Sequence, residues 1–230
     1  MAYRLRPVVL AVLLSTVAAV AAQSPSASEE VARLREAVTI VHEVMKGADT
    51  AIPDSILKRA EGIAVFPGAL SGGFIFGGQR GHGVLSGRTD KGWSPPTFLT
   101  LTGGSFGLQA GGQATDIVFV IMNRRGLENF IKNQFKFGAD AAAAAGPVGR
   151  DLQAGTDLQM RAEILSYSRA RGLFAGVTVN GSTVRSDADA IYRFYDTRFN
   201  STQIVVGGLA GSPGSTQEWQ GTLAKYAPPR

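Results

Sequence analysis

The stretch TFLTLTGGSFGLQAGGQATDIVFVIM, residues 97–122, decides how this chain folds. Two runs rich in β-branched and aromatic residues, Thr97 to Thr102 and Ile117 to Met122, enclose a glycine-rich run from Ser105 to Gly111. Short runs of this composition, separated by glycine turn signals, predict strands. Because glycine accepts positive φ at little cost, the spacing also favours tight turns and bent strands.

Upstream of this stretch, glycine continues to alternate with apolar residues. Further strands are predicted from Gly62 to Phe66, from Gly72 to Gln79 and from Gly81 to Gly87, with Gln79 and Arg80 in the hairpin between the last two. A series of short strands with turn signals between them is typical of an antiparallel meander.

Downstream, Glu163 to Ser168 and Leu173 to Val179 predict another hairpin, which turns near Arg171 and Gly172. The fold class predicted from all these segments is α+β. It consists of an antiparallel, glycine-rich β-sheet or a partly closed barrel, with several packed helices.

Capping residues and apolar spacing predict the helices. The first follows Ser28 and ends at Gly47, the second runs from Pro53 to Ala60, and another begins at Ser186. In the first helix, one face carries the apolar residues Val31, Leu34, Val38, Val41 and Met45. This face packs on the chain's own sheet or, as the alternative, lies on a membrane surface.

The first 22 residues predict a cleavable signal peptide. Arg4 and Arg6 supply positive charge, an apolar run extends from Pro7 to Val20, and small residues follow it. An uncleaved anchor is the alternative, although the run is shorter than the roughly 20 residues that span a bilayer. We therefore expect a signal peptide over 1–22, a single folded domain over 23–210 and a loosely ordered tail over 211–230.

The amino-acid composition excludes several classes of protein. The chain has no cysteine, which excludes disulfides, thiol nucleophiles and the lipid attachment of a bacterial lipoprotein. Its formal net charge is +5, of which Arg4 and Arg6 supply two. This excess favours anionic surfaces slightly and is too small to indicate nucleic acid. We expect an exported, periplasmic or secreted protein that associates peripherally with a membrane.

No set of residues predicts catalysis. The two histidines, His42 and His82, lie in different predicted elements. Residues 103–107 match the G-x-S-x-G pattern of hydrolases around Ser105, but the next residues favour a strand and no histidine follows. We therefore expect no catalytic residue, no metal and no cofactor, and interpret the chain as a non-enzyme.

Basic residues in predicted turns and short helices are the candidate binding residues. Guanidinium and ammonium groups bind lipid phosphates by charge-assisted hydrogen bonds. The candidates are Lys58, Arg59, Arg80, Arg88, Lys91, Arg124, Arg125, Arg150, Arg169 and Arg171.

Several motifs occur together in the order that one known family shows. They are Ile52-Pro53 with Ala60-Glu61-Gly62, Trp93-Ser94-Pro95-Pro96, Gly107-Leu108-Gln109-Ala110-Gly111, Ala145-Gly146-Pro147-Val148-Gly149-Arg150, Tyr167-Ser168 and Gly172-Leu173-Phe174-Ala175-Gly176. In these motifs, from about residue 35 to about residue 208, the chain resembles the SYLF (Ysc84-like) family.

The resemblance implies a domain that binds membrane lipids, particularly phosphoinositides in eukaryotic members, and some members also bind actin. Because an exported bacterial protein would rarely meet either, the expected partner is an anionic phospholipid and not actin. A protein-interaction or scaffolding module of the cell envelope, with an envelope protein as its partner, is the alternative.

Overall fold

A computed structural model describes residues 25–47, 51–72, 77–105, 113–132, 134–140, 143–149, 161–170, 173–177, 179 and 181–228. The predicted signal peptide over residues 1–22 lies outside the described residues. So do Arg150 and Arg171, two of the candidate binding residues.

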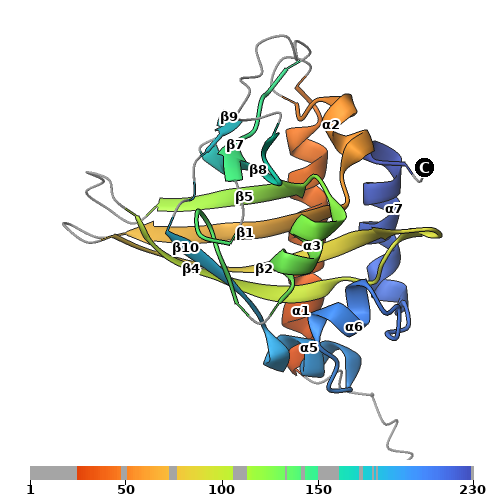
Figure 1. Cartoon of the computed structure of the whole chain (residues 1–230). Helices are drawn as coiled ribbons and strands as arrows, with labels where there is room; N and C mark the ends of the chain where they lie inside the picture. Colours follow the sequence, from red (N-terminus) through yellow and green to blue (C-terminus); the bar gives the residue numbers. More distant parts are fainter. Residues whose placement is uncertain are drawn as a thin grey trace, which may run out of the picture.

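The described strands form one sheet in the order β6-β10-β4-β2-β1-β5-β8-β7, with β3 paired to β2 and β9 to β8. Their bounds are β1 Gly62–Gly72, β2 Gly77–Thr89, β3 Gly92–Trp93, β4 Thr97–Ser105, β5 Gln113–Ile121, β6 Phe135–Lys136, β7 Ala143–Ala145, β8 Ile164–Ala170, β9 Leu173–Gly176 and β10 Ser182–Ser186. All these pairs are antiparallel except β7 with β8. The sheet curls strongly into a half-barrel (Figure 1), which confirms the predicted α+β class.

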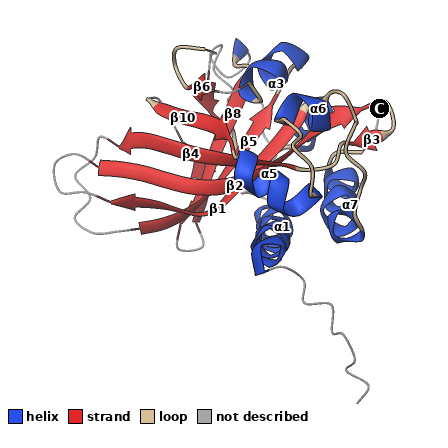
Figure 2. Ribbon diagram, turned by 90° about the horizontal axis from the view of Figure 1, so that it is seen from below, coloured by secondary structure: helices blue, strands red, loops and turns tan. Residues whose placement is uncertain are grey.

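The described helices are α1 Pro25–Val44, α2 Asp54–Arg59, α3 Arg124–Phe130, α5 Ala188–Tyr195, α6 Ser201–Val205 and α7 Gln217–Tyr226, with a 3₁₀ turn at Gly214–Thr216. Helices α1 and α7 pack against each other on one face of the sheet, which we call the outer face (Figure 2). Helix α3 lies on the other, inner face. The helices gather toward one end of the long strands.

Aromatic side chains fill the inner face. The rings of Phe66, Phe119, Phe130, Phe135 and Phe137 are all buried, and Phe119 stacks on Phe137 with centroids 4.8 Å apart. Each buried phenylalanine stabilises the fold by about 2 kcal/mol. Because these rings come from both sheet strands and α3, their burial favours a curled sheet over a flat one.

The outer face buries the apolar stripe of α1. Val41 and Val44 of α1 line a small apolar cavity together with Val118 and Val120 of β5 and Leu223 of α7. The first predicted helix therefore packs on its own domain in this structure, as the main interpretation of its spacing expected. Within the described part of the chain, none of the helices combines the length and apolar character needed to cross a bilayer.

The predicted hairpin at Gln79 and Arg80 is wrong. Both residues lie inside β2, which runs unbroken from Gly77 to Thr89. Arg80 pairs with Leu70 of β1 on one side and with Thr102 of β4 on the other. Neighbours on both sides satisfy the backbone hydrogen bonds, so this polar pair stays extended despite its local turn preference.

The predicted loose order of residues 211–230 is also wrong for the part that the structure describes. Trp219 of α7 is fully buried, and its indole nitrogen donates to the Ser86 hydroxyl at 2.9 Å. Leu223 and Ala227 are buried as well. The folded domain therefore continues through residue 228, because these apolar residues complete the cover of the outer face.

Candidate functional site

Arg88, a predicted binding residue, is a structural residue. Its side chain is only 6% exposed at the helix-covered end of β2. Its guanidinium donates to the carbonyl oxygens of Ala60 at 2.6 Å, Leu57 at 3.2 Å and Pro228 at 2.6 Å. It also lies over the Trp93 ring, 4.8 Å from the centroid. Arg88 thus ties α2 and the end of α7 to the sheet, and its charge does not reach the surface.

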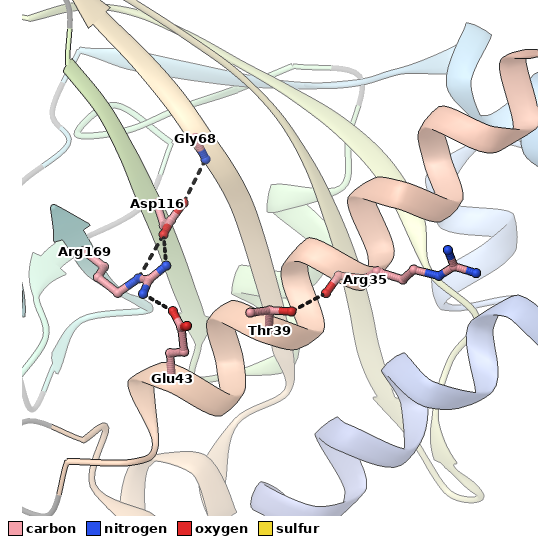
Figure 3. A network of polar contacts seen from close by, with 6 residues as sticks. All are labelled: Arg35, Thr39, Glu43, Gly68, Asp116 and Arg169. Atoms are coloured by element: carbon pink, nitrogen blue, oxygen red, sulfur yellow. Dashed lines mark hydrogen bonds and ion pairs between the residues drawn. The ribbon is translucent and has the colours of Figure 1, made fainter. Parts of the chain in front are cut away.

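Arg169 of β8 is also occupied by contacts within the fold. Its Nε and Nη2 atoms donate to one carboxylate oxygen of Asp116 at 2.9 and 2.6 Å, and Nη1 bonds Glu43 of α1 (Figure 3). The other carboxylate oxygen of Asp116 accepts the Gly68 N–H at 2.9 Å. This network fastens the end of α1 to strands β1, β5 and β8.

Most of the remaining candidates lie at the helix-covered end. Arg125 bonds Glu163, and Arg124 bonds Glu128 one turn further along α3. Lys91 is exposed in the turn between β2 and β3, and Lys58 and Arg59 are exposed on α2. Of this group, the structure brings Arg88 and Arg124 to one hollow, which they share with Glu61 and Asp90.

Arg80 lies apart from that group. It is exposed and lies eight residues before Arg88 on β2, which corresponds to roughly 26 Å along an extended strand. The described candidates therefore do not form one cationic patch. The helix-covered end holds most of them, mixed with carboxylates, and Arg80 stands at the open end of the outer face.

Strand pairing places Arg80 side by side with exposed residues of the neighbouring strands. Strand pairing places one residue from each of six neighbouring strands in a continuous line: Lys136 of β6, Thr183 of β10, Thr102 of β4, Arg80 of β2, Leu70 of β1 and Ala114 of β5. Directly opposed residues point to the same face of a sheet. We call this line the outer-face row. All its members are exposed except Thr183, which is half-buried.

A second line of partners runs beside the outer-face row. Arg185 of β10 pairs with Thr100 of β4, which pairs with His82 of β2. Arg185 and His82 are both exposed. The His82 ring lies 3.3 Å from Asp187, the residue that caps α5. Lys136, Arg80 and Arg185 thus place three cations on neighbouring strands of one surface.

The bulge in β1 sets the direction of Leu70. Pairing with β5 shifts between Phe66 and Ala69, around Gly68 with φ +52°. Because side chains alternate along a strand, one extra residue moves the following side chains to the opposite face. Asp116 accepts the N–H of Gly68 and stabilises the bulge. Leu70 consequently points outward, where its side chain is 62% exposed.

The carboxylates near this surface are engaged in contacts within the fold, so the net charge of the surface stays positive. Asp116 is paired with Arg169, and Asp187 faces His82 and the N–H of Ala190. Asp140 accepts the backbone N–H of Lys136. The uncovered half of the outer face is therefore a cationic and hydroxyl-bearing surface with an exposed leucine at its edge. Strands β1, β2, β4 and β5 run on past α1 to form it (Figure 1).

Sequence reasoning did not place Lys136 and Arg185 among the binding residues. A signal for Arg185 was present, since Thr183 and Arg185 alternate with the buried Ser182 and Val184 in β10. That alternation predicts which side chains leave the core. It does not predict which strands become neighbours.

The histidines and Ser105 occupy separate settings among the described residues. His42 Nδ1 lies 2.9 Å from the Tyr226 hydroxyl, whereas His82 faces Asp187. Ser105 ends β4 opposite Gly77, in a strand ladder. The described residues contain no group of three or more acidic or histidine side chains that could hold a metal ion. Burial raises the pKa of the Tyr167 hydroxyl, which keeps this phenol protonated.

The geometry defines an α+β domain in which helices cover one end of a curled antiparallel sheet and leave the other end of its outer face open. The Ysc84 family, described as "Las17-binding protein actin regulator", matches residues 102–226, more than half of the chain. The chain therefore belongs to the Ysc84 (SYLF) family, which confirms the resemblance seen in its motifs.

Relatives carry names that refer to binding. The chain is 33% identical over 171 residues to LAS seventeen-binding protein 3 and to Protein YSC84 of Saccharomyces cerevisiae, over 73% of its own length. It is 29% identical over 163 residues to the human SH3 domain-containing YSC84-like protein 1, over 70% of its length. The match spans 37% and 36% of the two yeast proteins and 47% of the human one.

Proposed function

We propose that this chain is a non-catalytic lipid-binding domain that docks on anionic phospholipid through the outer-face row and Arg185. The observation that carries the proposal is the alignment of Lys136, Arg80 and Arg185 on the open end of the sheet. Their side chains lie on strands, so the sheet fixes their spacing. A membrane surface is broad enough to contact all three at once.

The expected binding free energies support a reversible, peripheral contact with the membrane. Each basic residue near an anionic membrane contributes about 1 kcal/mol. Three such residues would strengthen binding on the order of 100-fold. Insertion of Leu70, 62% exposed, would add about 1 kcal/mol of apolar burial.

The setting we propose is the cell envelope. The predicted signal peptide favours an exported protein, periplasmic or secreted, that meets the membrane from outside the cytoplasm. The names of the relatives refer to Las17 binding and to actin regulation. An exported protein would have little access to actin, and we propose phospholipid as the partner of this member.

Vesicle sedimentation tests the proposal. The chain should bind vesicles containing phosphatidylglycerol and leave pure phosphatidylcholine vesicles in the supernatant, with binding that weakens as salt rises. The triple variant Arg80→Glu, Lys136→Glu, Arg185→Glu should lose at least 100-fold in affinity.

The matched control is Lys91→Glu, Lys132→Glu, Arg161→Glu, which makes the same charge change at exposed positions away from the row. It should keep most of the binding. Equal loss in both triple variants would indicate attraction by net charge alone. Equal recovery on neutral and anionic vesicles would contradict lipid binding through these cations.

The second candidate function is that of a protein-interaction module, and the observation that favours it is the edge strand β9. Strand β9 pairs with β8, and Leu173 on β9 is 78% exposed. An open edge strand can accept a strand from another protein. If this is the function, Leu173→Glu, which puts a charge on this exposed edge position, should abolish capture of a purified envelope partner and leave vesicle binding unchanged.

A further inference from the structure

A hollow of about 440 Å³ lies at the helix-covered end, far along β2 from the outer-face row. The junction of α2 with β1, the β2–β3 turn, the start of α3 and the end of α6 surround it. Its charged lining consists of Glu61, Arg88, Asp90 and Arg124, and its apolar lining consists of Val205 and Val206. A volume of this size falls within the usual range for small-molecule sites.

A ligand in the hollow would meet charged side chains of both signs. The Arg88 guanidinium is bound by the backbone carbonyl groups of Ala60 and Leu57, so its charge is taken up within the fold. Arg124 and Asp90 are exposed at its rim, and Glu61 is half-buried. One available cation, Arg124, beside two carboxylates does not favour a multiply charged phosphate. A ligand with one anionic group and one ammonium group fits this arrangement better.

Arg124 is suited to bind the anionic group. A guanidinium carries five N–H donors. Arg124 donates one bond to Glu128 at 3.2 Å and one to the Arg88 carbonyl at 3.4 Å. The pair with Glu128 is exposed, with side chains 43% and 51% accessible. Exposed helix pairs of this kind are weak, so a ligand anion can share or replace that contact.

Asp90 is suited to bind the ammonium group, because the β2–β3 turn presents its carboxylate at the rim of the hollow. The apolar wall consists of Val205, which is buried, and Val206, which is 37% exposed. These side chains would cover a short hydrocarbon portion of the ligand.

We propose that this hollow binds a small zwitterion, with its anionic group on Arg124, its ammonium on Asp90 and its hydrocarbon part on Val206. Phosphoethanolamine, as part of a phospholipid headgroup, and a free α-amino acid share this chemistry. The proposal concerns a different surface from the membrane-docking row and does not depend on it.

Isothermal titration calorimetry with the whole chain tests the site. The probes are glycerophosphoethanolamine, leucine and glycerophosphate, which has the anion without the ammonium. We expect at least one zwitterion to bind with a submillimolar Kd and glycerophosphate to bind at least tenfold more weakly. Binding of glycerophosphoethanolamine alone identifies a headgroup, and binding of leucine alone identifies a free amino acid.

Variants separate this site from general attraction. Arg124→Ala and Asp90→Asn should each weaken binding of the zwitterion at least tenfold. Lys132→Ala, an exposed change near the end of α3, should leave it unchanged. The proposal is overturned if neither zwitterion binds at millimolar concentration, if glycerophosphate binds as tightly as the zwitterions, or if Arg124→Ala and Asp90→Asn bind like the unchanged chain.

Discussion

Arg88 and Arg80 occupy the two ends of one strand, β2, and their even spacing places both side chains on its outer face. Arg88 is 6% exposed and donates to carbonyl oxygens of Leu57, Ala60 and Pro228. Arg80 is exposed, and its strand neighbours are Leu70 and Thr102. The same residue type in the same strand thus has a structural role at one end and a surface role at the other.

The comparison shows that the role of each arginine depends on whether helices pack over that end of the sheet, and not on the strand that carries it. At the Arg88 end, α2 and α7 bring carbonyl groups and apolar side chains onto the sheet. At the Arg80 end, the long strands continue beyond α1 (Figure 1). Four changes test this division, beginning with the one that should cost the most stability.

Trp219→Ala should have the largest effect, because it removes the fully buried indole that fixes α7 on the covered end. We expect a loss of about 4 kcal/mol in the free energy of unfolding. Urea denaturation followed by circular dichroism measures it. A loss below about 1 kcal/mol would mean that α7 contributes little to the domain.

Arg88→Ala should follow, with a loss of about 3 kcal/mol, because several buried carbonyl groups would lose a charged donor. The matched change Arg80→Ala at the open end should stay within about 0.5 kcal/mol. Both variants are compared in the same urea titration. Similar losses in the two variants would remove the distinction between the ends of β2.

Asp116→Ala sits between the two ends and should cost about 2 kcal/mol, because it leaves Arg169 and the N–H of Gly68 without their shared partner. The bulge that directs Leu70 outward should loosen. Hydrogen exchange at Gly68 should quicken in this variant, while exchange in α7 stays as it was. Unchanged exchange at Gly68 would contradict the role given to Asp116.

Arg80→Glu with Lys136→Glu should have the smallest effect on stability, within about 0.5 kcal/mol of the unchanged chain. Neither side chain contributes a described hydrogen bond or ion pair to the covered end. A thermal unfolding curve measures the change. A loss of several kcal/mol would show that the open end also depends on these residues for its fold.

Local sequence signals predicted much of the fold. Capping and apolar spacing located α1 and α2, and α5 follows Asp187, next to the predicted start at Ser186. Strands β8 and β9 pair antiparallel, as the predicted hairpin of Glu163 to Ser168 with Leu173 to Val179 requires. These features depend on neighbours within a few residues, so the sequence alone contains the information.

Contacts between distant segments could not be predicted in this way. Residues Gln79 and Arg80 favour a turn locally, but β1 and β4 pair on both sides of them. The burial of Arg88 depends on Pro228, 140 residues further along the chain. The outer-face row likewise requires the register of β6, β10 and β4, which no local pattern specifies.

The central claim is that the open end of the outer face meets the membrane, and fluorescent labelling tests it most directly. Because the chain has no cysteine, Thr102→Cys and Lys91→Cys each give a single labelling site, one in the outer-face row and one at the covered end. With an environment-sensitive dye and phosphatidylglycerol vesicles, we expect a blue-shifted, brighter emission from the label at residue 102 and no change at residue 91. A change at residue 91 with none at residue 102 would contradict the account.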